Sequence, residues 1–115
     1  MVALVNKYNA RKVVIDGITF ASGLEGRRYR MLKLMERAGE ITGLRLQVVY
    51  DLNVNGIKIG HYIADFVYLI NGVEIIEDAK GKLTEMFKRS AKHMAAQGQP
   101  VTIWPPRPVK TRKRK

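Results

Sequence analysis

The sequence predicts an α/β fold in which a mixed β-sheet is flanked by helices, in the order β-hairpin, helix, three strands, helix and strand. Two observations carry this prediction. Short apolar segments flank Asp-Gly and Asn-Gly pairs, which are typical of tight hairpin turns. Two longer segments, 22–38 and 83–97, place apolar side chains at helical spacing and end at glycine. The 115 residues have the length of one domain.

The N-terminal third predicts an arm, a hairpin and a helix. Residues 1–12 are expected to form a flexible basic arm. The apolar segments 13–15 and 18–20 flank Asp16-Gly17, which predicts the hairpin. Ser22 followed by Glu25 fits a capping box, so the first helix should begin at Ser22 and end at Ala38-Gly39.

The rest of the chain predicts four strands, a helix and a tail. Strands are expected at 41–52, 58–70 and 73–79, separated by turns at 53–56 and at Asn71-Gly72. A helix at 83–97 and a last strand at 101–104 follow. Residues 105–115 are rich in proline and basic residues and are expected to be a disordered tail, which leaves 13–104 as the domain.

The charge of the chain indicates a polyanionic partner. The net charge is +11, from 21 Lys and Arg against 10 Asp and Glu. It stays positive without the basic tail, which indicates a polyanionic partner for the domain itself. Nucleic acid is favoured over a membrane surface because no strongly amphipathic basic helix is evident. The absence of cysteine excludes disulfides and thiolate metal sites. No apolar segment approaches the roughly 20 residues that span a bilayer, and no signal peptide is evident, so we expect an intracellular protein.

Charged residues inside apolar strands are the main functional signal. Asp65 lies within the strand at 58–70, and Asp78 and Lys80 close the strand at 73–79. Burying such charges is costly unless they are paired or bind a metal. Two carboxylates, with the backbone carbonyl of Ala79 between Asp78 and Lys80, suit Mg²⁺ or Mn²⁺, and Lys80 would stabilise negative charge on a phosphodiester. The simpler interpretation is an exposed acid–lysine pair at a strand end.

Other polar residues have structural interpretations. Glu25 is explained by the helix cap alone, since a glutamate at this position also favours the helix dipole. Gln47 is equally well explained as a contact of the site or as an ordinary strand residue. Structural, packing or surface roles are expected for Glu77, His61, His93 and Trp104.

The ordered set of motifs resembles the small phage-type nucleases of the PD-(D/E)XK superfamily, including the Holliday-junction resolvases. The resemblance covers roughly residues 8–104. It rests on the hairpin at 14–20, Ser22-x-x-Glu25 opening a basic helix, the segments 38–41 and 46–47, Tyr62-Ile63-Ala64-Asp65-Phe66 and Glu77-Asp78-Ala79-Lys80-Gly81. Ala64 stands where the superfamily motif has proline.

The resemblance implies a restriction-endonuclease-like core at 13–104 and a metal-dependent DNA endonuclease. Its catalytic residues would be Glu25, Asp65, Asp78 and Lys80. Mg²⁺, with Mn²⁺ as a substitute, would bind Asp65, Asp78 and the carbonyl of Ala79, with Glu25 as an additional candidate ligand. A resolvase would work as a homodimer that makes paired nicks in branched DNA, in the cytoplasm of a bacterial or archaeal cell, encoded by the host or by a phage.

The basic residues of the two helices would contact phosphates and position the DNA. Those expected to do so are Arg27, Arg28, Arg30, Lys82, Lys88 and Arg89. Two alternatives stay open at the level of sequence. One is a nuclease of the same superfamily that acts on flaps, ends or ordinary duplex. The other is a noncatalytic basic module that binds nucleic acid, in which the acids are incidental.

Overall fold

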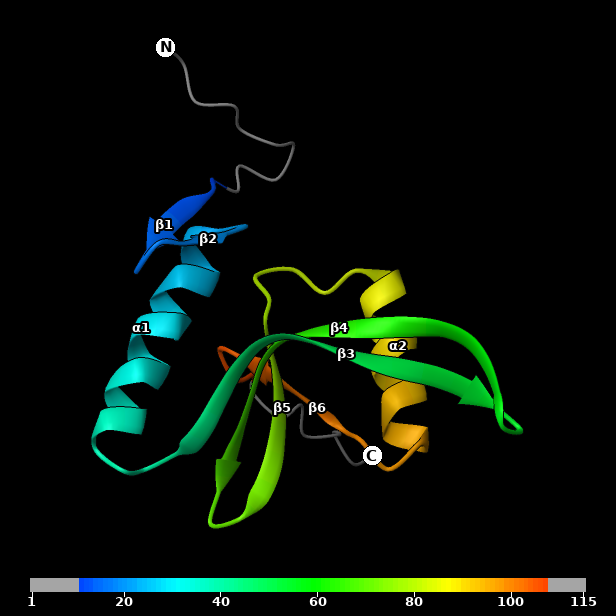
Figure 1. Ribbon diagram of the computed structural model, residues 1–115. Coiled ribbons are helices and arrows are strands. Elements are labelled where there is room, and N and C mark those ends of the chain that lie inside the picture. Colours follow the sequence, from blue (N-terminus) through cyan, green and yellow to red (C-terminus); the bar gives the residue numbers. More distant parts are fainter. Residues whose placement is uncertain (1–10, 108–115) are drawn as a thin grey trace, which may run out of the picture.

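The computed structural model describes residues 11–107 as two helices, a small hairpin and a four-stranded sheet (Figure 1). The arm predicted for 1–12 lies outside the described residues except for its last two positions. The tail predicted for 105–115 lies outside them except for its first three. The elements are β1 (Val13–Ile15), β2 (Ile18–Phe20), α1 (Gly23–Arg37), β3 (Thr42–Val54), β4 (Ile57–Ile70), β5 (Val73–Ala79), α2 (Glu85–Ala96) and β6 (Val101–Trp104).

The sheet is mixed, as the sequence predicts. Its strand order is β3-β4-β5-β6, in which β3, β4 and β5 are antiparallel neighbours and β6 is parallel to β5. The parallel pair needs a crossover, and α2 supplies it. The fold is therefore a mixed α/β arrangement in which α1 and α2 lie on opposite sides of the sheet (Figure 1).

Local sequence explains the hairpins and the helix ends. Each of the three hairpin turns pairs a left-handed Asp or Asn with a left-handed glycine, which is the backbone that a two-residue hairpin requires. Ser22 caps α1 by accepting a hydrogen bond of 3.2 Å from the N–H of Glu25. Gly39, with φ of +78°, ends the helix, as expected from its freedom to adopt left-handed backbone.

Several boundaries differ from those expected. The strand predicted at 41–52 runs to Val54 and its partner begins at Ile57, because the turn needs only Asn55-Gly56. The helix predicted at 83–97 is shorter, because Thr84 caps it and accepts a hydrogen bond of 3.1 Å from the N–H of Phe87. Within residues 11–107, neither helix is long and apolar enough to cross a membrane.

The sheet forks in its middle, and this fork positions the candidate functional site. β4 pairs with β5 only from Phe66 onward, whereas its first half pairs with β3 alone. The last two residues of β5, Asp78 and Ala79, pair with β6 but not with β4. Figure 1 shows the long β3–β4 hairpin curving away from β5 at this point.

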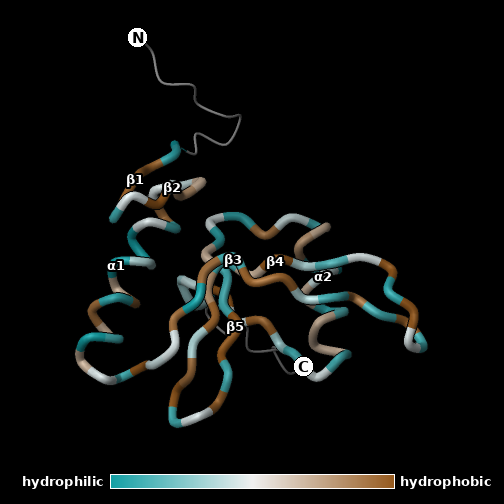
Figure 2. The backbone as a smooth tube through the Cα atoms, viewed as in Figure 1, coloured by the Kyte–Doolittle hydropathy of each residue, from teal (hydrophilic) through white to brown (hydrophobic). Residues whose placement is uncertain are grey.

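Two hydrophobic clusters fill the two sides of the fork. One joins α1 and the β1–β2 hairpin to the paired part of the sheet, with Phe20, Leu32 and Phe66 among its buried side chains. The other joins α2 to the first half of β4, with Ala64 and Met94 completely buried. Figure 2 shows the matching alternation of hydrophobic and hydrophilic residues along β3 and β4.

Candidate active site at the fork of the sheet

Asp65 and Asp78 face each other where the pairing of β4 with β5 stops. The N–H of Asp65 donates to Oδ1 of Asp78 at 3.0 Å, and the N–H of Ala79 donates to Oδ2 of Asp65 at 3.1 Å. The two carboxylates thus replace backbone acceptors and close the end of the ladder. Asp78 is 1% exposed and Asp65 is half-buried, so neither acid is an ordinary surface residue.

Burial of these two acids disfavours their charged forms and raises their pKa values. Burial raises the pKa of Asp78 to about 6, although the N–H of Asp65 and the charge of Lys80 act in the opposite direction. Burial also raises the pKa of Asp65, against the bond from Ala79. A cation bound between the two carboxylates would remove much of this cost.

Glu25 is turned toward the same acids. Burial raises the pKa of its carboxyl to about 7, and the charge of Asp65 raises it further while that of Lys80 lowers it. The charge of Asp78 also contributes. Within the described residues, the Glu25 side chain forms none of the bonds of a capping box; only its N–H is bound to Ser22. The cap therefore explains the position of Glu25 on α1 but not the direction of its carboxyl.

Lys80 follows β5 directly, and its backbone is held on both sides. Its N–H donates to the carbonyl of Trp104 at 2.9 Å, and its own carbonyl accepts a hydrogen bond from Arg107. Arg107 also binds the carbonyl of Gly81 at 3.1 Å. Arg107, within the segment expected to be a tail, thus contacts the residues that follow β5. The ammonium of Lys80 lies 5.2 Å from the centre of the Phe87 ring.

A pocket opens beside this cluster. It has a volume of about 400 Å³ and is lined by residues of β2, the turn after it, α1, β3 and β4: Ile18, Thr19, Phe20, Ala21, Glu25, Leu46, Gln47 and Asp65. The contribution of the β2 hairpin to this wall was not expected from the sequence, which treats the hairpin as a fold element only. Gln47, left open by the sequence, is a contact of the site: its amide donates to Oδ1 of Asp65 at 3.4 Å.

The donor set suits Mg²⁺ in part. Among residues 11–107, no group of three or more His, Asp and Glu side chains is placed to hold a metal ion. Mg²⁺ is nevertheless commonly held by one or two carboxylates, with waters and substrate phosphates completing its ligands. Asp65 and Asp78 satisfy that simpler requirement. The N–H of Ala79 points to Asp65, and because both polar groups of a strand residue face the same edge, its carbonyl faces that side too.

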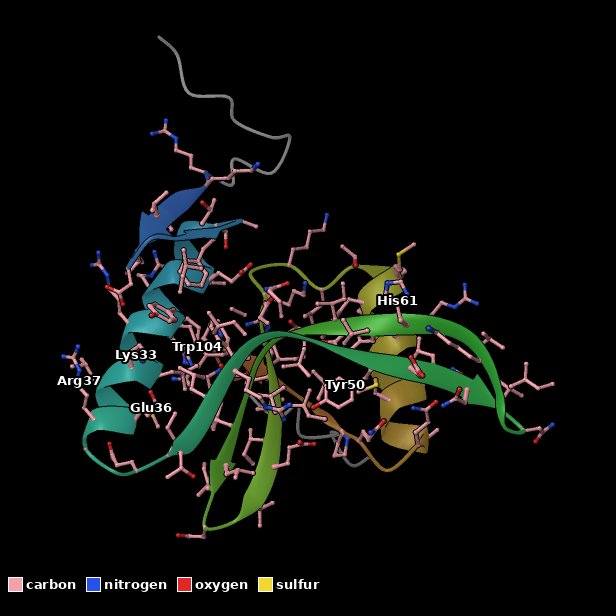
Figure 3. All side chains as sticks on the ribbon, viewed as in Figure 1. Lys33, Glu36, Arg37, Tyr50, His61 and Trp104 are labelled. Atoms are coloured by element: carbon pink, nitrogen blue, oxygen red, sulfur yellow. The ribbon has the colours of Figure 1, made fainter. Side chains whose placement is uncertain are left out.

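Arg28 is not available to bind DNA, contrary to the prediction from sequence. Its guanidinium forms two hydrogen bonds of 2.8 Å with the carboxylate of Glu77, which is 1% exposed. The hydroxyl of Tyr68 donates to the same carboxylate at 2.6 Å. The guanidinium also lies 5.2 Å from the centre of the Trp104 ring, whose place beside α1 Figure 3 shows. Arg28 and Glu77 therefore join α1 to β5, one residue from Asp78.

The other predicted phosphate-binding residues are on the surface. Arg27 and Arg30 are exposed on α1 together with Arg37, and none of the three forms an ion pair within residues 11–107. We call these three the α1 arginine surface. Lys82, Lys88 and Arg89 are also exposed, on the loop before α2 and on α2 itself, and Lys88 pairs with Glu85 at 3.4 Å. The structure thus brings the acids and Lys80 together but separates the basic residues into two groups.

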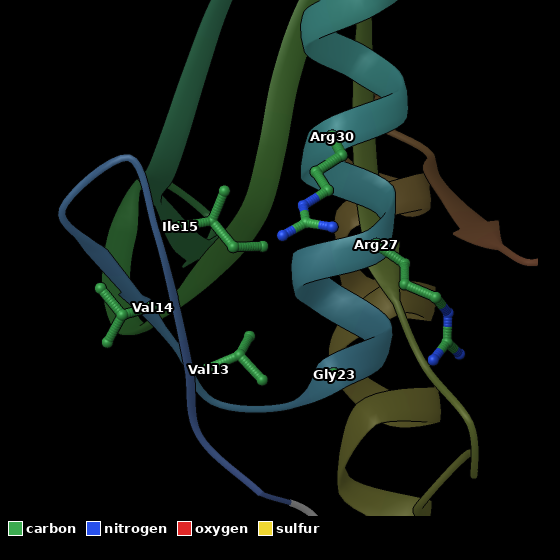
Figure 4. A pocket seen from close by; sticks show the side chains of 6 residues that line it. All are labelled: Val13, Val14, Ile15, Gly23, Arg27 and Arg30. Atoms are coloured by element: carbon green, nitrogen blue, oxygen red, sulfur yellow. The ribbon is translucent and has the colours of Figure 1, made fainter.

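Two shallow grooves follow the α1 arginine surface. One, of about 250 Å³, lies between β1 and α1 and contains Arg27 and Arg30. Figure 4 shows Val13 and Ile15 pointing from β1 toward α1, with Arg30 directed back toward Ile15. The second, of about 340 Å³, shares Ile15 and Arg30 and continues to Arg37. Both grooves thus place the apolar side chain of Ile15 beside arginines that form no ion pair among residues 11–107.

The remaining sequence interpretations have simple outcomes. Trp104 packs against the first hydrophobic cluster, as expected. His93 contacts the carbonyl of Asn53 at 2.8 Å, and His61 is exposed on β4 (Figure 3). Glu77 has the structural role expected of it, but as a buried ion-pair partner.

Comparison with known proteins places the chain in a family. No curated protein and no solved structure matches its sequence or fold significantly. One family model, described as "Protein of unknown function (DUF1064)", matches residues 5–112, which is nearly the whole chain. The chain therefore belongs to the DUF1064 family.

Proposed function

We propose that this protein is a Mg²⁺-dependent DNA endonuclease that cuts branched DNA, in the manner of a Holliday-junction resolvase. The observation that carries the proposal is the convergence of Glu25, Asp65, Asp78 and Lys80 at the fork, three acids with raised pKa values beside one cation. Two backbone hydrogen bonds to these carboxylates do not require three acids and a lysine to be gathered at one place. Such a gathering is typical of a catalytic site.

Each residue has a role in hydrolysis of a phosphodiester. Asp65 and Asp78, with the carbonyl of Ala79, would hold Mg²⁺, and Glu25 borders the same space. A bound Mg²⁺ supplies Lewis-acid chemistry, which lowers the pKa of a water and offsets negative charge on the phosphate. The water would lose a proton to solvent as its oxygen forms a bond to phosphorus, and the bond to one sugar oxygen would break, that oxygen taking a proton from solvent. Lys80 stabilises the negative charge that builds up on the phosphate.

The surface charge supports DNA as the substrate. The α1 arginine surface would bind phosphates on the exposed face of the helix that carries Glu25. Lys82, Lys88 and Arg89 would contact the backbone on the other side of the fork. Selectivity for a junction would come from branch geometry and from a homodimer, since paired nicks in opposite strands need two active sites.

The test is cleavage of a labelled four-way junction beside a linear duplex of matched sequence, with Mg²⁺ and with EDTA. Wild type is compared with Asp78→Asn, which keeps an oxygen to accept the bond from Asp65. Asp51→Asn is the control, because Asp51 is an exposed acid whose partner, Lys58 at 3.3 Å, lies on the distant part of the β3–β4 hairpin. A mobility-shift assay measures DNA binding separately.

We expect paired nicks in the junction alone, lost in EDTA and in Asp78→Asn but kept in Asp51→Asn. Equal cutting of both DNAs would leave a nuclease but refute the junction specificity. Binding without cutting, in any divalent metal, would make the protein a noncatalytic nucleic-acid-binding module. Cleavage by Asp78→Asn at the wild-type rate would remove the proposed site.

A further inference from the structure

Gln47 has a backbone conformation that its sequence does not explain. Four non-glycine residues of the described chain have positive φ: Asp16, Gln47, Asn55 and Asn71. Three of them are Asp or Asn in two-residue hairpin turns, where the left-handed conformation is required and well tolerated. Gln47, with φ of +51°, lies instead inside β3. A side chain with a Cβ is strained there, and such strain is concentrated at functional sites.

The strained residue lies opposite Asp65. The pairing of β3 with β4 keeps one register on both sides of this position but omits it, so Gln47 faces Asp65 where the ladder is interrupted. The interruption in β3 coincides with the fork on the other edge of β4. Asp65 therefore lacks regular pairing on either side, and its carboxylate is positioned by other groups.

Those groups bind its two oxygens from opposite strands. The Gln47 amide donates to Oδ1 at 3.4 Å from β3, and the N–H of Ala79 donates to Oδ2 at 3.1 Å from β5. Gln47 also lines the pocket of about 400 Å³ together with Glu25. A donor on each oxygen fixes the plane of a carboxylate and the direction of its remaining lone pairs, which is how supporting residues orient metal ligands.

We propose that Gln47 is a positioning residue: its left-handed backbone turns the side-chain amide onto Asp65 and orients that carboxylate toward the pocket. The inference rests on the proposed function, because it assumes that Asp65 is a ligand. The competing explanation is architectural. The kink lies where β3 passes from the first hydrophobic cluster, which contains Leu46, to the second, which contains Val48, and it would then serve only the curvature of the sheet.

Two substitutions separate these explanations, because they allow the left-handed backbone and remove the hydrogen bond from the side-chain amide to Asp65. Gln47→Gly favours positive φ, and Gln47→Asn tolerates it but is one methylene too short to reach Asp65 in the same way. Asn55→Gly is the matched control, since Asn55 has the same φ of +51° but lies in the β3–β4 turn. Four quantities are measured for each: the melting temperature, the 13C shift of the Asp65 carboxyl without metal, Mg²⁺ affinity by calorimetry, and Mg²⁺-dependent cleavage.

We expect both Gln47 variants to melt no more than about 3 °C below wild type. Their Asp65 carboxyl resonance should shift, and cleavage and Mg²⁺ affinity should fall by about 10-fold or more. Asn55→Gly should match wild type in all of these. An unshifted Asp65 resonance, or wild-type cleavage in Gln47→Gly, would overturn the positioning role. If wild type cuts no DNA, the proposed function fails. The role of Gln47 is then still decided by two measurements, the Asp65 carboxyl resonance and the Mg²⁺ affinity from calorimetry.

Discussion

The ion pair between Arg28 and Glu77 makes a quantitative prediction about stability. Substitution Arg28→Met keeps much of the side-chain volume but leaves the carboxylate of Glu77 buried without its cation. The two side chains are 10% and 1% exposed, so water cannot replace the lost partner. Removing one member of such a pair costs about 3–5 kcal/mol. At about 4 °C per kcal/mol for a chain of this size, the melting temperature should fall by about 12–20 °C.

Urea denaturation measures the predicted loss in the free energy of unfolding, and thermal melting measures the predicted fall in melting temperature. Trp104 is the only tryptophan and lies beside the Arg28 guanidinium, so its fluorescence reports on this part of the core, and circular dichroism reports on the whole fold. Arg27→Met and Arg30→Met are controls from the same helix whose side chains are exposed, and each should change the free energy of unfolding by less than about 0.5 kcal/mol.

A double variant tests the electrostatic reasoning itself. In Arg28→Met with Glu77→Gln, neither position carries a charge, and the glutamine oxygen still accepts the bond from Tyr68, so most of the lost stability should return. If Arg28→Met costs less than about 1 kcal/mol, the guanidinium is not buried and paired as described, and the original assignment of Arg28 to DNA would have to be restored.

Three further predictions follow from the structure. Gly26→Ala should lower the free energy of unfolding by about 1–3 kcal/mol, measured by thermal unfolding, because the new Cβ would lie 2.7 Å from a methyl carbon of Val13. In the control Gly23→Ala, the new Cβ meets nothing closer than 3.9 Å, so stability should not fall in this way. Burial raises the pKa of Glu25 to about 7 from 4.5, so between these pH values the folded protein holds a proton that the unfolded chain releases. The free energy of unfolding should therefore fall as pH rises from 4.5 to 7. Glu25→Gln should weaken that decline, as measured by the melting temperature at each pH. Each of Arg27→Ala and Arg30→Ala should weaken DNA binding and reduce the slope of log K against log salt by about 1, measured by salt titration.

The local features of the chain could be predicted from its sequence. The Asn71-Gly72 turn sets the pairing of the flanking strands, and that pairing brings Asp65 opposite Asp78. The cap at Ser22 sets the position of Glu25 on its helix. Each of these inferences needs only neighbouring residues and one known turn or cap geometry.

The wrong prediction for Arg28 came from assigning a helix arginine to the surface. Arg28 stands four residues from both Leu24 and Leu32, on the apolar face of α1, and Glu77 lies between two core positions of β5. The helical spacing of the apolar residues thus indicated that Arg28 lies on the buried face of α1. With several arginines on one helix, the composition alone does not show which of them is buried. For the left-handed Gln47 no sequence signal exists, because glutamine has no preference for that conformation.

The fork of the sheet also has a consequence for the order in which the protein folds. Asp65 and Asp78 are 13 residues apart across a single hairpin, so their loop closes early and at little entropic cost. Arg28 and Glu77 are 49 residues apart, and they bring α1 and its Glu25 to that hairpin. We expect the two aspartates to meet before the glutamate joins them. Destabilising the Asn71-Gly72 hairpin should therefore slow folding, whereas breaking the Arg28–Glu77 pair should mainly speed unfolding.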